Sequence, residues 1–260
     1  MVEAAAKRDV TGLLTRAAIA LAFGGVAAAL VAAIGSGQGL WHFRGAFAVL
    51  KWAFYAVVAG AVLALVGLVL ARRARQSRLV AANAIALVVA LAFILYLGAQ
   101  VRTARSVPAI HDVATNLDDL PQFSRLAVRP DNLEEVPAGD RAELAALDPE
   151  ARWKALHREA YGDLNTITVP ADVPGVIRRA EALARERGWE IARVDTAAGI
   201  LEATDTSTFF RFKDDVVVRA RPAPGGGAAV DMRSVSRIGV SDVGVNAERV
   251  REFLDDLEAA

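Results

Sequence analysis

Three apolar stretches of 18 to 21 residues occupy the first hundred positions of the chain, at Ala17–Ile34, Trp52–Ala71 and Leu79–Ala99. None of the three contains Asp, Glu, Arg or Lys. At a rise of about 1.5 Å per residue, a helix of this length crosses the roughly 30 Å hydrocarbon core of a bilayer. The pattern therefore predicts a three-helix transmembrane anchor within residues 1–100.

Beyond residue 100 the apolar residues recur at the spacings of amphipathic helices and strands, which is typical of a water-soluble domain. Residues 101–160 are polar and marked by prolines, and we expect a connector with a helical turn at Asp140–Leu147 and a short helix at Pro149–Tyr161. One face of that short helix carries Trp153, Leu156, His157 and Ala160. We expect the connector to lead into a folded unit at residues 161–260.

Two amphipathic helices are predicted in residues 161–260. The first begins after Asp172, a residue that can cap it, and ends at Gly188. The second carries apolar side chains at the spacing i, i+3, i+4, i+7, namely Val250, Phe253, Leu254 and Leu257. Asp242 or Asn246 is the candidate cap of this final helix.

Five strands are predicted in the same region from β-rich segments separated by turn residues. They are Asn165–Val169, Trp189–Asp195, Ile200–Thr206, Asp214–Arg221 and Ala228–Val235. The order is β-α-β-β-β-β-α, in which hairpin-linked strands form an antiparallel sheet and both helices can cover one face of it. We therefore expect an α+β soluble domain preceded by three transmembrane α-helices.

Charge divides the chain at the same point as hydrophobicity. The first hundred residues hold nine Lys and Arg against two acidic residues, whereas the remaining 160 hold 21 against 28. The acidic balance of the second part argues against a nucleic-acid partner, which selects basic patches. Cysteine is absent. Disulfides, thiolate metal sites and a cysteine nucleophile are therefore excluded.

The first apolar stretch is interpreted as a retained anchor. It exceeds the 7–15-residue apolar core of a signal peptide, and Gly35-Ser36-Gly37 is a poor cleavage site. The positive-inside rule then sets the orientation. The N-terminal tail and the loop between the second and third stretches carry seven Lys and Arg, and the other two flanks carry four. We expect a cytoplasmic N-terminus and a periplasmic C-terminal domain, held in a bacterial inner membrane.

Transport is not the function that the spans indicate. A transport path normally requires an ionisable group in mid-membrane, and the strong polar group within the spans is Asn83, near an end. We therefore interpret the spans as an anchor, integral to the membrane.

A first candidate site lies in the connector. His111 and Asp112 could act as a base and its orienting acid or as metal ligands, and Thr115 follows closely. The alternative is a connector whose polar side chains cap local turns. The pair Asp214-Asp215 could serve acid–base chemistry, although neighbouring residues on an extended chain point in opposite directions.

A second candidate site surrounds the end of the last strand. Its polar residues are Arg233, Ser234, Ser236, Arg237, Ser241, Asp242 and Asn246. A serine nucleophile is not favoured, because no histidine is nearby in sequence. Two arginines beside a helix N-terminus suit an anion or a partner protein, and the same groups could also simply hold the loop. We assign no catalytic residue, metal ligand or cofactor to the chain.

Four segments resemble a known family. They are Ile110–Asn116, Gly199–Thr204, Phe210–Arg219 and Asp231–Arg251. Together they resemble domain of unknown function 1499, over roughly residues 107–257. That family occurs in bacteria and plastids, sometimes behind membrane spans. The resemblance implies a shared domain but no activity, so no catalytic residue is carried over from it.

Two hypotheses of function follow. The first is a non-catalytic cell-envelope module that binds an envelope protein, a lipid or a wall component through its sheet face and the loop between Arg233 and Asn246. The second is a periplasmic hydrolase or metal-dependent enzyme built from His111 and Asp112 with the Asp214-Asp215 pair. The second hypothesis requires these segments to meet in one cleft.

Overall fold

The computed structural model describes residues 2–134 and 136–259 of the chain. The chain forms two compact units. The first is helical and comprises residues up to 102 together with Thr208–Arg211, and the second comprises residues 103–207 and the chain from Phe212 onward. Each unit is described separately below.

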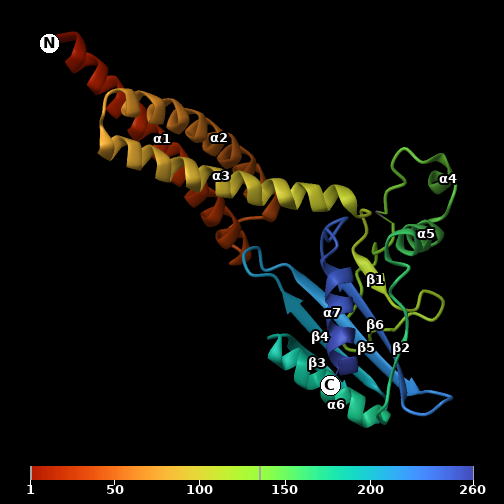
Figure 1. Ribbon diagram of the computed structural model, residues 1–260. Helices are drawn as coiled ribbons and strands as arrows, with labels where there is room; N and C mark the ends of the chain where they lie inside the picture. The colour runs from red at the N-terminus through yellow and green to blue at the C-terminus, as the bar shows by residue number, and fades with distance from the viewer. Residues whose placement is uncertain (1, 135, 260) are drawn as a thin grey trace. The chain divides into compact units, whose positions relative to one another are not determined.

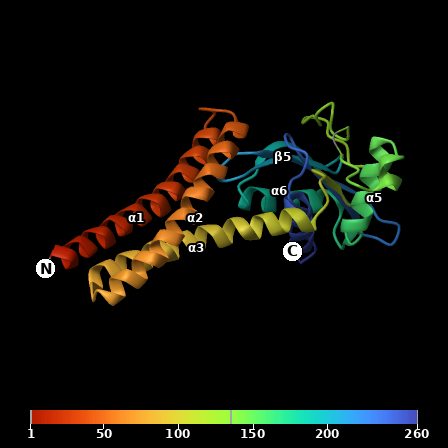
Figure 2. The same cartoon turned by 90° about the horizontal axis from the view of Figure 1, so that it is seen from above.

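The first unit contains three long helices, α1 at Val2–Gly37, α2 at Phe43–Arg73 and α3 at Ser77–Ser106 (Figures 1 and 2). The stretches Val10–Gly37, α2 and α3 are long and apolar enough to cross a membrane, with hydropathies of 2.4 to 2.5. The prediction of three long apolar helices before the α+β domain is thus confirmed, and each is a candidate membrane span. Each helix extends beyond the apolar stretch that predicted it.

Small residues allow the first two helices to pack closely. A Cβ atom built on Gly60 of α2 would lie 2.8 Å from the backbone nitrogen of Ala22 in α1. Close approach through small residues is the usual way in which membrane helices associate. In α3, the buried Asn83 amide donates to the hydroxyl of Thr15 in α1 at 2.8 Å. The polar group in the spans therefore has a structural partner.

The second unit begins with elements of the expected connector. These are β1 at Asp112–Ala114, α4 at Ala142–Ala145 and α5 at Pro149–Tyr161. Both helical segments were predicted, and Asp148 caps α5 by accepting from the backbone nitrogen of Ala151 at 2.9 Å. The face of α5 differs at one position, because Ala160 is exposed and Tyr161 is buried in its place.

The remaining elements follow in the predicted order. They are β2 at Ile167–Val169, α6 at Val173–Glu186, β3 at Glu190–Asp195, β4 at Ile200–Thr206, β5 at Lys213–Pro222, β6 at Ala228–Ser236 and α7 at Val245–Ala259. The strands form one antiparallel sheet in the order β1-β6-β5-β4-β3, with β2 also paired to β6. The expected α+β fold is confirmed. The added feature is β1, which extends the sheet from within the connector.

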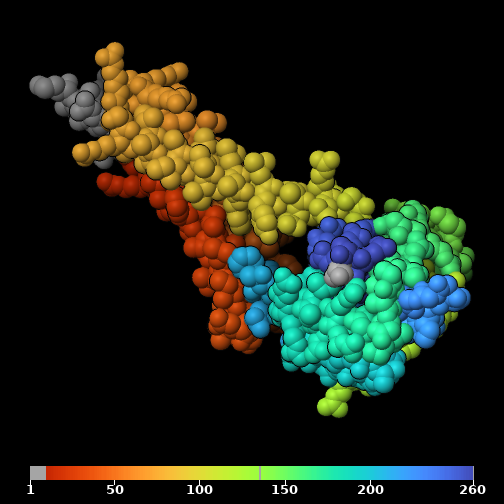
Figure 3. All heavy atoms as spheres, turned by 60° about the horizontal axis from the view of Figure 1, so that its bottom comes forward, coloured from red at the N-terminus to blue at the C-terminus, as the bar shows by residue number. Residues whose placement is uncertain are grey.

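Helices α6 and α7 pack side by side against one face of the sheet (Figures 1 and 3). Val216, Val218 and Met232 project from β5 and β6 into this layer and are fully buried or nearly so. Phe253 of α7 stacks on Trp189 with ring centroids 5.1 Å apart. Burial of apolar surface in this layer provides the main stabilisation of the domain. The opposite face of the sheet is charged.

Candidate functional site

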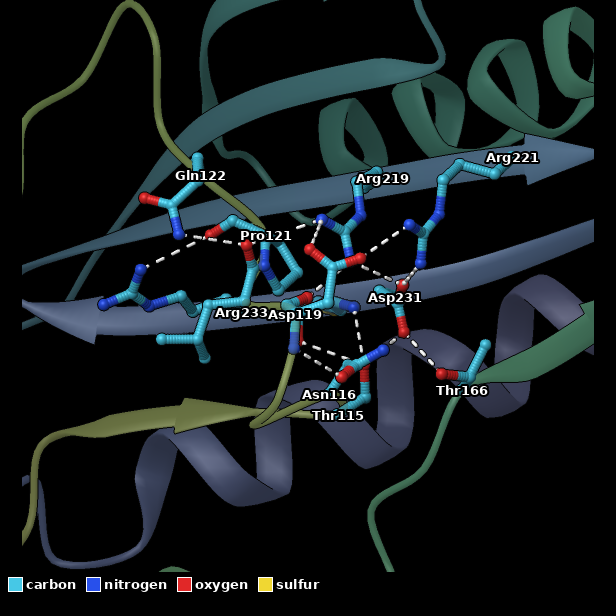
Figure 4. Close-up of polar contacts among 12 residues, drawn as sticks. Thr115, Asn116, Asp119, Pro121, Gln122, Thr166, Arg219, Arg221, Asp231 and Arg233 are labelled. Carbon is cyan, nitrogen blue, oxygen red and sulfur yellow. Dashed lines mark hydrogen bonds and ion pairs between the residues drawn. The ribbon is translucent and has the colours of Figure 1, made fainter. Parts of the chain in front are cut away.

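The second face of the sheet carries ionisable side chains that are almost completely buried. The register of β4, β5 and β6 places on this face Glu202, Asp215, Arg219, Asp231 and Arg233, together with Asp112 of β1. The stretch 115–134, here called the covering segment, makes hydrogen bonds to several of these side chains (Figure 4). A charge removed from water is costly unless it is paired and hydrogen-bonded. The site is therefore defined by how each of these charges is paired.

Asp231 lies at the centre of the first cluster (Figure 4). Its Oδ2 accepts from Nη2 of Arg219 at 2.9 Å and from Nη2 of Arg221 at 3.0 Å. Its Oδ1 accepts from the hydroxyls of Thr166 at 2.5 Å and Thr115 at 3.3 Å. The side chain of Asp231 is completely buried. Two arginines and two hydroxyls thus compensate one buried carboxylate.

The covering segment is held to this cluster by charge. Asp119 accepts from Arg221 at 2.6 Å and from Arg219 at 3.2 Å, and the hydrogen bond from Arg221 is the largest cause of the lowered pKa of Asp119. Further along, Glu202 of β4 accepts from the backbone nitrogens of residues 124–126 at 2.8 to 3.1 Å. Burial opposes ionisation of Glu202, but these donors outweigh it and its pKa is lowered.

The candidate site that the sequence predicted around His111 and Asp112 forms a second buried cluster. Arg233 donates to Asp112 through Nε at 3.0 Å and Nη2 at 2.6 Å. Asn132 donates to the same carboxylate at 2.5 Å, and its Oδ1 lies 3.1 Å from Nε2 of His111. Nδ1 of His111 lies 3.3 Å from the carbonyl oxygen of Val240. Both ring nitrogens of His111 therefore face protein oxygens in a buried position.

Asp214 and Asp215 point to opposite faces of the sheet, as expected for neighbours on a strand. Asp215 pairs with Arg237 at 2.8 and 2.9 Å, on the charged face. Asp214 pairs with Arg249 of α7 at 2.8 Å, on the helix-covered face. Asp112 and Asp215 flank Val235 from the two neighbouring strands, which places their backbones two strand spacings, about 10 Å, apart. Asp112, Asp214 and Asp215 thus belong to three separate ion pairs.

The second candidate site is held together by α7. Asn246 accepts from Ser234 at 2.6 Å and donates to Ser236 at 3.0 Å and to the carbonyl of His111 at 2.9 Å. The hydroxyls on the helix-covered face thus have partners in the protein. Asp242 accepts from the backbone nitrogen of Asn246 in the first turn of α7 at 2.6 Å, although the helix begins at Val245 and Asp242 precedes it by three positions.

The remaining residues of this site lie nearer to solvent. Ser241 accepts from the backbone nitrogen of Val243 at 3.1 Å. Arg237 keeps 41 % of its side chain exposed although it pairs with Asp215. Burial raises the pKa of Asp242, opposed by its hydrogen bonds from the backbone at Asn246 and Gly244. A binding role for Ser241, Asp242 and Arg237 stays a prediction.

A polar cleft of about 470 Å³ lies beside the Asp231 cluster. It lies between the start of the covering segment, the last turns of α5 and the loop before β2. The residues in its wall include Thr115, Asn116, Asp118, His157, Asn165 and Thr166. Arg158 and Asp118 pair with each other at 3.1 Å in this wall. Of the cleft residues, Thr115 was predicted from the sequence as a candidate site residue, and His157 was predicted on one face of the short helix.

Two aromatic side chains in the cleft wall have unusual environments. His157 accepts from the backbone nitrogen of Ala114 through Nε2 at 3.2 Å, and burial lowers its pKa to about 4. It is therefore neutral at pH 7 and carries its proton on Nδ1. Burial also raises the pKa of Tyr161 to about 12, and its hydroxyl has no hydrogen-bond partner within the described part of the chain.

No group of three or more His, Asp and Glu residues is arranged to hold a metal ion within residues 2–134 and 136–259. The charged groups are instead arranged in ion pairs that join the covering segment, the sheet and α7. The fold and these clusters define a class, an α+β domain that follows three candidate membrane-spanning helices and has a charged, covered sheet face.

The sequence comparisons then give the family. The model of the family of proteins of unknown function DUF1499 matches residues 112–257, more than half of the chain. The protein therefore belongs to the DUF1499 family, as its motifs indicated. A search of curated proteins found no match.

Proposed function

We propose that this protein is a non-catalytic cell-envelope binding module, anchored in the bacterial inner membrane, with its α+β domain in the periplasm. The observation that carries the proposal is the pairing of the buried charges. Asp112, Asp214, Asp215 and Asp231 each bind an arginine. A catalytic acid or base needs hydrogen-bond reach to a substrate, and these carboxylates are engaged by the protein itself.

The proposed binding site is the polar cleft beside the Asp231 cluster. The sheet face that the sequence suggested as a binding surface lies beneath the covering segment, and Asp231 and Arg233 are buried. The cleft, in contrast, is open and lined by amide and hydroxyl groups. Its ionised residues Asp118 and Arg158 pair with each other, and His157 is neutral at pH 7.

This chemistry favours a neutral ligand that is rich in hydroxyl and amide groups. Among the described residues of the cleft wall, a strongly anionic ligand would meet no cation that is not already paired. A strongly cationic ligand would likewise meet no unpaired carboxylate. Of the partners that the sequence left open, a sugar unit of a cell-wall component suits such a cleft best.

The binding experiment uses the full chain in lipid nanodiscs and the neutral disaccharide diacetylchitobiose as the probe. Asp118→Trp would fill the mouth of the cleft from a position whose side chain is 83 % exposed. Asp131→Trp, at another exposed position outside the cleft wall, is the matched control. We expect calorimetric titration to show binding that Asp118→Trp weakens at least about tenfold, or about 1.4 kcal/mol. Equal binding by both variants, or none by the parent protein, would contradict the proposal.

The location is tested separately by reporter fusions after the C-terminus. With three spans and a cytoplasmic N-terminus, alkaline phosphatase fused there should be active and a cytoplasmic fluorescent reporter should be dark. The basis of this expectation is the asymmetry of Lys and Arg, including Arg72 and Arg73 at the end of α2, Arg75 in the following turn and Arg78 at the start of α3. The opposite reporter pattern would place the domain in the cytoplasm.

A further inference from the structure

One loop of the α+β unit gathers exposed apolar side chains. Within the described part of the chain from residue 103 onward, excluding the segment 208–211, the large apolar side chains that are well exposed are Leu147, Ile238, Val240 and Val245. The last three lie on the loop between β6 and the first turn of α7, with 40 %, 40 % and 50 % of their surface exposed. We call Ile238, Val240 and Val245 the apolar rim. Single exposed apolar residues are common, and here three of them fall within positions 238–245.

The apolar rim lies where the chain enters the domain. The backbone nitrogen of Asp242 donates to the carbonyl of Ile110 at 3.2 Å, and a Cβ atom on Gly244 would lie 3.2 Å from Val107. Residues 107–110 therefore run directly beside the loop that carries the rim. They follow α3, the third membrane-spanning helix, which ends at Ser106.

The covalent connection keeps this loop within reach of a bilayer. The apolar stretch of the third span ends at Ala99, and the chain stays helical to Ser106. At about 1.5 Å per residue, Val107 lies within roughly 12 Å of the end of the span along the chain. An interfacial segment inserts its apolar side chains about 5–10 Å into the boundary between headgroups and acyl chains. The length of the connection is thus compatible with a loop that touches the same membrane.

The residues beside the rim suit a phospholipid headgroup layer. Arg237 begins the loop, and its backbone nitrogen donates to the carbonyl of Lys213 at 3.0 Å. Both basic side chains are 41 % exposed, and each also pairs with a carboxylate, Arg237 with Asp215 and Lys213 with Glu190. The carboxylate of Asp242, the acidic residue of the loop, accepts hydrogen bonds from the backbone nitrogens of Gly244 and Asn246. Apolar side chains flanked by basic ones are the usual composition of an interfacial membrane contact.

We propose that the apolar rim contacts the lipid surface of the membrane in which the protein is anchored. Ile238 and Val240 insert into the interfacial layer, and Arg237 and Lys213 lie at the level of the lipid phosphates. The contact needs no particular side of the membrane, because it depends only on the connection to α3. It is therefore independent of the cleft ligand and of the proposed location.

The absence of cysteine from the chain makes the test direct. Ile238→Cys and Val240→Cys, each labelled with the environment-sensitive fluorophore NBD, are reconstituted as full-length protein in phosphatidylcholine and phosphatidylglycerol vesicles. Pro224→Cys is the matched control, because Pro224 is exposed in the turn at the other end of β5. Doxyl groups attached to the lipid acyl chains serve as quenchers.

We expect blue-shifted emission at positions 238 and 240 and at least about twofold stronger quenching by doxyl lipid than at position 224. Emission at 238 and 240 that resembles a water-exposed label, as at 224, would overturn the proposal. Blue-shifted emission that doxyl lipid does not quench would overturn it as well, because a protein surface would then cover the rim. The fluorescence readout does not depend on any ligand of the cleft.

Discussion

Asp112 and Arg233 form a two-point ion pair between β1 and β6, with Nε to Oδ1 at 3.0 Å and Nη2 to Oδ2 at 2.6 Å. Only 1 % of the Asp112 side chain and 7 % of the Arg233 side chain are exposed. The pair joins the strand that follows the membrane anchor to the long strand β6. It also binds the covering segment, because Asn132 donates to the same carboxylate.

Removing one partner of this pair should be much more damaging than removing both. Arg233→Met leaves Asp112 as an uncompensated buried charge, and we expect the free energy of unfolding to fall by about 3–5 kcal/mol. The double variant Asp112→Leu/Arg233→Met should recover a large part of that loss. Urea unfolding of the full chain in detergent, followed by tryptophan fluorescence, measures both. Additive losses in the double variant would mean that the two residues do not act as a pair.

Glu202 should hold the covering segment closed. Glu202→Gln replaces a carboxylate oxygen, which accepts from the backbone nitrogens of residues 124–126, by an amide group that can only donate. Hydrogen bonds to a charged acceptor are worth about 1.5–3 kcal/mol each, and the variant loses this charge. We expect trypsin to cleave after Arg125 at least about tenfold faster in this variant, because the segment opens more often. Glu190→Gln, at an exposed ion pair with Lys213, is the control. An unchanged cleavage rate would show that other contacts hold the segment.

The secondary structure was largely predictable because it depends on local signals. Asp172 caps α6 by accepting from the backbone nitrogen of Gly175 at 2.8 Å, and Ile200–Thr206 is a strand with the predicted limits. These features follow from caps, turns and hydrophobic periods within a few residues. The three spans were predictable for the same reason, since length and apolar composition identify them.

The charged face and the cleft depend on partners that are distant in sequence. β1 has three residues and exists because Asp112 pairs in register with Val235, 123 positions later. The alternation of residues along β6 places Asp231 on the face of Arg233, but its partners Arg219 and Thr166 come from β5 and from the loop before β2. A pattern of alternation gives the face of a strand and does not identify what covers it.

Tyr161→Phe should not destabilise the protein. The Tyr161 hydroxyl is buried without a hydrogen-bond partner in the described residues, so it bears a desolvation cost that phenylalanine would not. We expect the free energy of unfolding to stay equal or to rise by about 1 kcal/mol. Tyr161→Leu, which also removes ring packing against His157, should be destabilising. A marked loss in Tyr161→Phe, measured by urea unfolding, would indicate that the hydroxyl has a partner such as an ordered water.

His157 should make the stability of the domain depend on pH. Burial lowers its pKa from 6.5 to about 4, so between these values the unfolded chain binds a proton that the folded chain does not. The contribution of His157 is therefore complete above pH 6.5 and falls as the pH drops towards 4, by roughly 3 kcal/mol in total. His157→Gln keeps an acceptor for the Ala114 amide and should flatten this part of the curve, whereas His42→Gln, at an exposed histidine, should not. Urea unfolding of the three proteins from pH 4 to pH 8 gives the comparison, and parallel curves for all three would refute a buried neutral His157.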